Sequence, residues 1–105
     1  MQTLILPIKK QWFDMILNGI KTEEYREIKP YWENRFLKLF EKDIEGNWSD
    51  ASKTIIFRNG YGNNKPQFSA ECSLREDIGK QEWGAEANTI YFVLSIHRIF
   101  DIKNN

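Results

Sequence analysis

The chain contains a single cysteine, Cys72, so no disulfide bond can form within it. Disulfide frameworks are typical of small secreted domains, and nothing here favours an oxidising compartment. No segment approaches the roughly 18 apolar residues that a membrane-spanning helix requires. Met1–Pro7 also lacks the basic and apolar regions of a signal peptide. We therefore expect a cytoplasmic protein with no membrane partner.

An excess of charge of either sign is also lacking, because 15 Lys and Arg residues balance 15 Asp and Glu residues. Proteins that coat nucleic acids non-specifically release counterions from phosphates, which requires an excess of positive charge. The balanced composition argues against that mode of binding but leaves room for one local basic pocket. We find no glycine-rich phosphate-binding loop, no dinucleotide fingerprint and no metal-ligand spacing. No cofactor and no metal are expected.

Apolar residues, in contrast, are plentiful: 41% of the chain is hydrophobic, including seven Phe, four Trp and four Tyr. A chain of 105 residues can bury one core but not two, so residues 1–105 are predicted to form a single domain. Trp12, Trp32 and Trp48 are interpreted as anchors of the core or of loops. Cys72 alternates with apolar residues and is interpreted as a buried small hydrophobe.

Hydrophobic periodicity predicts seven regular elements. Two segments have apolar residues at helical spacing: Gln11–Asn18 and Tyr31–Glu41. Five segments are predicted as strands: Leu4–Ile8, Lys21–Ile28, Lys53–Arg58, Gln67–Leu74 and Thr89–Ile102. With the helices early and three strands late, this order favours an α+β fold, a small open β-barrel of about five strands flanked by two helices.

The most informative stretch is the charged segment Gly19–Glu27 (GIKTEEYRE). Alternation along a strand places Thr22, Glu24 and Arg26 on one face. Lys21 falls on the other face unless it lies at the loop-to-strand junction, where its long side chain can reach Glu24. Arg and Lys together can hold an anion while a carboxylate accepts from a base amino group, so a ligand cleft is expected. The alternative is a paired charge on a solvated sheet face.

Four further side chains are candidates for the rim of such a cleft. Lys9 follows the first predicted strand and extends the basic character. Arg58, Asn59 and Tyr61 lie in or beside a glycine-rich loop, and Tyr61 is suited to stacking on a base. His97 is the only histidine, and without companion ligands it is interpreted as structural rather than catalytic.

The segment Leu6–Arg35 (LPIKKQWFDMILNGIKTEEYREIKPYWENR) resembles the start of an ASCH domain, a family of the PUA-like superfamily. In that family, a strand ending in a basic residue is followed by a helix and then by a G-x-K-x-x-E-x-R pattern on the next strand. The matching residues here are Lys9, Gly19, Lys21, Glu24 and Arg26. The resemblance continues more weakly in Arg58–Gly62 (RNGYG) and at Trp83-Gly84. It implies a PUA-like β-barrel whose charged cleft binds RNA or a modified nucleoside.

The resemblance also implies a catalytic alternative. One branch of the family hydrolyses N4-acetylcytidine with a Lys, a nearby Thr and a distant Glu, and another has been proposed to cleave RNA. Lys21 matches that Lys, whereas the Thr position falls on Glu24, the more usual residue in the wider family. Three hypotheses therefore stay open. They are binding of RNA or a nucleotide, hydrolysis of a modified nucleoside or of RNA with Lys21 and Glu24 as catalytic residues, and an interaction module without ligand chemistry.

Overall fold

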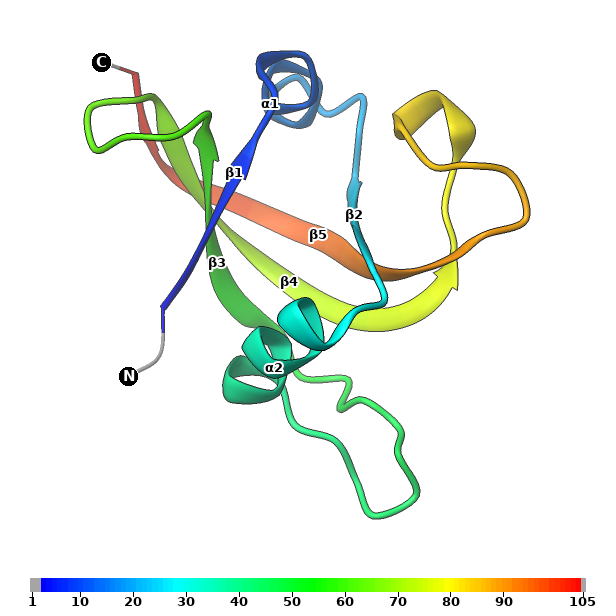
Figure 1. Ribbon diagram of the computed structural model, residues 1–105. Helices are drawn as coiled ribbons and strands as arrows, with labels where there is room; N and C mark the ends of the chain where they lie inside the picture. The colour runs from blue at the N-terminus through cyan, green and yellow to red at the C-terminus, as the bar shows by residue number, and fades with distance from the viewer. Residues whose placement is uncertain (1–2, 105) are drawn as a thin grey trace.

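The computed structural model describes residues 3–104, so Met1, Gln2 and Asn105 of the predicted domain lie outside it. Within these residues the elements follow one another as β1 (Leu4–Ile8), α1 (Lys10–Leu17), β2 (Glu23–Glu27), α2 (Pro30–Leu39), β3 (Lys53–Asn59), β4 (Gln67–Ile78), the short 3₁₀ helix η1 (Gln81–Trp83) and β5 (Ile90–Lys103) (Figure 1). All seven predicted elements are present. The largest difference is in β4, which continues to Ile78 instead of ending at Leu74.

The strands form one mixed sheet in the order β1-β3-β4-β5-β2, in which only β1 and β3 run parallel. Two irregularities in the β4–β5 register accompany the curl of the sheet, which is visible in Figure 1. The predicted α+β class, with five strands and two helices, is thus confirmed.

The sheet is open rather than closed into a barrel. Its edge strands are β1 and β2, and no backbone ladder joins them in residues 3–104. Pro7 in β1 has no N–H group to donate, which suits an edge strand. The link between the two edges is instead a side chain, because Nη2 of Arg26 in β2 donates to the carbonyl oxygen of Pro7 at 3.1 Å.

The main core lies between the sheet and the two helices. The predicted alternation in β4 is confirmed, since four of its side chains are almost completely buried: Phe68, Ala70, Cys72 and Leu74. They pack with Phe13 and Ile16 of α1 and Phe36 of α2. A second, smaller cluster covers the other face of the sheet and contains Tyr25, Trp83, Ala85, Tyr91 and Val93.

The register of β2 against β5 sets the positions of the charged side chains. Glu24 lies opposite Leu94 and Arg26 opposite Phe92, and both of these apolar partners belong to the main core. Cross-strand partners point to the same face of a sheet. Glu24 and Arg26 therefore point to the core side, at the edge strand where the core meets the surface.

Candidate functional site

Lys21, Glu24 and Arg26 form a continuous series of ion pairs at the edge of the core. Lys21 Nζ donates to Glu24 Oε1, and Arg26 Nη1 donates to Glu24 Oε2 at 2.7 Å. Lys21 also donates to the backbone oxygen of Glu23. Lys21 is 1% exposed and Glu24 is 6% exposed. Each carboxylate oxygen of Glu24 is thus held by a different cation.

The turn between α1 and β2 directs Lys21 toward Glu24. Gly19 adopts a positive φ of 75°, the left-handed conformation that often terminates a helix. The N–H groups of Ile20 and Lys21 then both donate to the carbonyl oxygen of Met15, at 2.9 and 3.1 Å. Lys21 therefore precedes the regular part of β2, and strand alternation does not constrain its side chain.

The ammonium group of Lys21 is enclosed, because the side chain is 0% exposed. Its Nζ lies 5.5 Å from the ring centroids of both Trp12 and Tyr25, a cation–π distance. Burial lowers the pKa of Lys21, and the nearby Glu24 carboxylate opposes this decrease. Lys21 does not itself line the cavities described next. It contacts Glu24, which lines both of them.

Two adjoining cavities open beside this ion-pair series. The β1-side cavity has a volume of about 670 Å³ and extends along β1, past Lys9, to Tyr31 and Arg35 of α2. The η1-side cavity, of about 380 Å³, extends toward Trp83 and Glu86. Four residues line both cavities and form their boundary: Trp12, Glu24, Arg26 and Trp32.

Arg26 is the central residue of this boundary. Its Nη1 also donates to the carbonyl oxygen of Tyr25 at 2.7 Å, and its guanidinium carbon lies 5.1 Å from the ring centroid of Trp32. The side chain is 15% exposed. Arg26 is thus fixed by Glu24, by two backbone carbonyls and by an aromatic ring, while one part of it remains accessible from the cavities.

The structure brings together most, but not all, of the predicted site residues. Lys9, Glu24, Arg26 and Tyr61 line the β1-side cavity, and Lys21 lies behind Glu24. The other three predicted residues line neither cavity. Thr22 is exposed just before β2, Arg58 donates to Gln67 Oε1 at 3.0 and 3.2 Å, and the N–H of Asn59 donates to the carbonyl oxygen of Pro66.

The sequence interpretation missed several aromatic and charged lining residues. Trp12 and Trp32 do pack against the core, as expected of anchors, yet both are only half-buried and line both cavities. Arg35 stacks on Tyr31 with its guanidinium carbon 3.4 Å from the ring centroid. Their i, i+4 spacing on a predicted helix is the sequence feature from which this contact could have been predicted. Glu86 lies in a loop with no sequence signal for a site.

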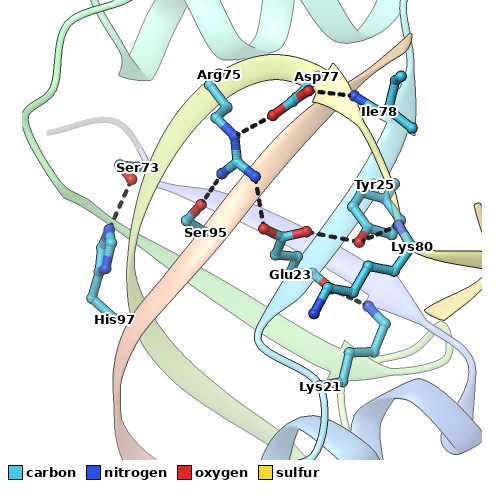
Figure 2. Close-up of polar contacts among 10 residues, drawn as sticks. All are labelled: Lys21, Glu23, Tyr25, Ser73, Arg75, Asp77, Ile78, Lys80, Ser95 and His97. Carbon is cyan, nitrogen blue, oxygen red and sulfur yellow. Dashed lines mark hydrogen bonds and ion pairs between the residues drawn. The ribbon is translucent and has the colours of Figure 1, made fainter. Parts of the chain in front are cut away.

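Figure 2 shows a second polar network, on the other face of β2. Glu23 accepts a hydrogen bond from Arg75 at 2.7 Å and from the Tyr25 hydroxyl at 2.8 Å. The Tyr25 oxygen in turn accepts from the N–H of Lys80 at 2.9 Å. Burial raises the pKa of Tyr25, so the hydroxyl stays protonated. This network ties β2 to the segment that begins η1, and so fixes the wall of the η1-side cavity.

The only histidine lies apart from both cavities. His97 Nε2 is 2.8 Å from the Ser73 hydroxyl on an exposed part of β4 and β5 (Figure 2).

Among residues 3–104, His, Cys, Asp and Glu side chains form no group of three able to hold a metal ion. No helix in the described part of the chain is long and apolar enough to cross a membrane. Comparisons with family models, with curated proteins and with solved structures find no match for this chain.

Proposed function

We propose that the chain is an ASCH domain of the PUA-like type that binds RNA or a nucleotide-sized ligand in the two adjoining cavities. The observation that carries this proposal is the boundary set of Trp12, Glu24, Arg26 and Trp32, which combines two indole rings with a fixed guanidinium and carboxylate. Aromatic rings stack on bases, guanidinium groups bind phosphates or base edges, and carboxylates accept from amino groups.

The size and the charge of the β1-side cavity support a nucleotide. Its volume of about 670 Å³ lies in the range usual for small-molecule sites. Lys9 and Arg35 line it, and in the described part of the chain neither has a carboxylate partner. Both cations are therefore available to a phosphate group.

The family assignment is supported by the Gly19–Glu27 segment and by the course of the chain around it. The residues that match the ASCH pattern follow a strand and a helix in the expected order, and Lys21, Glu24 and Arg26 converge in space. The PUA-like barrel of the proposal corresponds here to a curled open sheet whose edges are bridged by Arg26.

Binding is tested by titrating the protein with a mixed-sequence single-stranded RNA and with mononucleotides at several salt concentrations. Trp32→Ala should weaken binding by about five- to 150-fold, because loss of one base–aromatic stack costs about 1–3 kcal/mol. Trp48→Ala is the matched control, since Trp48 is also half-buried but lines neither cavity. RNA affinity should also fall as salt rises. Absence of binding, or equal weakening in both variants, would contradict the proposal.

The second candidate is hydrolysis of a modified nucleoside or of RNA through Lys21 and Glu24. The observation in its favour is the lowered pKa of Lys21, which is typical of lysines used as bases or nucleophiles. Catalysis requires that a bound substrate release Lys21 Nζ from its enclosed position. The test is turnover of N4-acetylcytidine and of a mixed RNA pool by the wild type and by Lys21→Met. Equal turnover in the two proteins would exclude Lys21 as the catalytic group.

A further inference from the structure

The charged residues divide between the two cavities by sign. The β1-side cavity is lined by three cationic side chains, Lys9, Arg26 and Arg35, and by one carboxylate, that of Glu24. The η1-side cavity has the reverse composition. Its lining has one cation, that of Arg26, and three carboxylates: Glu24, Glu27 and Glu86. The two cavities share the Glu24–Arg26 pair, so the difference between them comes from the residues beyond it.

The two distinguishing carboxylates remain available as acceptors. Glu27 pairs with Lys29 at 2.9 Å, but both side chains are more than half exposed, and exposed pairs of this kind contribute little. Glu86 has no ion-pair partner in the described part of the chain. Its backbone N–H donates to the hydroxyl of Tyr91 at 2.9 Å, which holds Glu86 beside the cavity that Tyr91 also lines.

We propose that the two cavities hold opposite ends of one nucleotide, the phosphate beside Lys9 and Arg35 and an amino group of the base facing Glu27 and Glu86. The ring of the base then lies at the boundary, where Trp12 and Trp32 offer aromatic surface to both cavities. The inference rests on the proposed function and names its substrate class: nucleotides whose bases carry an exocyclic amino group.

The selectivity follows from hydrogen-bond donors and acceptors. Cytosine presents an amino donor where uracil presents a carbonyl acceptor, and ionised carboxylates only accept. A uracil oxygen that faces Glu27 and Glu86 would form no hydrogen bond with them, because the carbonyl and both carboxylates are acceptors. Adenine and hypoxanthine differ in the same way at the corresponding position. The cavities should therefore prefer CMP to UMP and AMP to IMP.

The experiment measures affinities of CMP, UMP, AMP, IMP and cytidine by titration calorimetry. The wild type should bind CMP about tenfold more tightly than UMP, the effect expected of one hydrogen bond to a charged acceptor. Glu86→Gln should reduce this preference, because glutamine both donates and accepts, whereas Glu27 still only accepts. Glu82→Gln is the control, since Glu82 is exposed on η1 and lines neither cavity.

The phosphate end is tested independently with Arg35→Gln. This variant should reduce the ratio of CMP to cytidine affinity while leaving the ratio of CMP to UMP unchanged, and Lys38→Gln on the same helix should change neither ratio. Equal affinity of the wild type for CMP and UMP would overturn the inference and leave the proposed nucleotide binding in place. A loss of CMP over UMP preference in Arg35→Gln would overturn the assigned orientation. Absence of all binding would overturn the proposed function as well.

Discussion

Replacement of Glu24 by glutamine should strongly destabilise the protein. The change leaves the Lys21 ammonium, whose side chain is 0% exposed, without its carboxylate partner. It also places a neutral amide beside Arg26 Nη1, which in the wild type donates to Glu24 Oε2 at 2.7 Å. Breaking a buried ion pair by removing one partner costs about 3–5 kcal/mol. Because Lys21 keeps the Glu23 carbonyl as a hydrogen-bond acceptor, we expect a cost near the lower limit, about 3 kcal/mol.

This loss is large relative to the stability of a domain of this size. The free energy of unfolding of a small domain is about 5–15 kcal/mol, and each kcal/mol of lost stability lowers the midpoint of thermal unfolding by roughly 4–8 °C. The variant should therefore melt roughly 10–25 °C below the wild type. Urea denaturation at neutral pH, followed by circular dichroism, measures the free energy of unfolding directly.

The double variant Lys21→Met/Glu24→Gln separates a buried unpaired charge from a simple loss of packing. If the cost of Glu24→Gln comes from the buried ammonium of Lys21 that has lost its carboxylate partner, removing that ammonium should recover most of the lost stability. Arg26 keeps its bonds to the carbonyls of Tyr25 and Pro7 in either variant. A cost of less than about 1 kcal/mol for Glu24→Gln, or a double variant whose cost equals the sum of the costs of Glu24→Gln and Lys21→Met, would show that Glu24→Gln leaves no costly buried charge.

Three other predictions concern titration, reactivity and packing. Between the lowered pKa of Lys21 and its ordinary value of 10.5, the unfolded chain binds more protons than the folded chain, so the unfolding free energy of the wild type should rise with pH relative to that of Lys21→Met. Tyr25 is present in both proteins, so its contribution cancels in the comparison, and parallel pH curves for the two proteins would contradict the prediction. Burial raises the pKa of Cys72 to about 12, so a thiol reagent at mildly alkaline pH should react only as the protein unfolds, and rapid labelling of native protein would exclude the buried position. Gly79→Ala would place a Cβ 2.7 Å from that of Ala85 and 2.8 Å from Tyr25 Cζ, so the unfolding free energy should fall by about 1–3 kcal/mol, and an unchanged urea midpoint would show that the contact relaxes.

The elements of the fold were predictable because local signals agreed with one another. In β4, alternation at Phe68, Ala70 and Cys72 identifies the buried face regardless of which strand lies alongside. Gly19 marks the end of α1 because its positive φ suits glycine. Periodicity does not specify neighbours, however. The parallel pairing of β1 with β3 joins segments separated by about half the chain, and an open sheet differs from a barrel only in the contacts of its two edges.

Strand alternation predicts only the part of the candidate site that belongs to β2, whereas Lys9 and Tyr61, which also line the β1-side cavity, were predicted from their positions beside a strand and in a loop. Glu24 and Arg26 share a face by alternation, and the structure places them in contact. The remaining lining residues come from other elements, such as Trp32 and Arg35 of α2 and Glu86 of the loop before β5. A half-buried tryptophan has the same periodicity as a core residue. Its second role appears only when another element leaves part of the ring uncovered.

Lys21 discriminates best among the three hypotheses. A buried ammonium is costly, and an apolar residue of similar volume would often serve the core equally well or better. Its contact with Glu24 is explained if that carboxylate must be held in one orientation at the boundary of two cavities, with Arg26 holding its other oxygen. An interaction module without ligand chemistry has no such requirement. Between binding and hydrolysis, the enclosure of Lys21 Nζ favours binding, because the group best suited to catalysis is the one that the cavities do not reach.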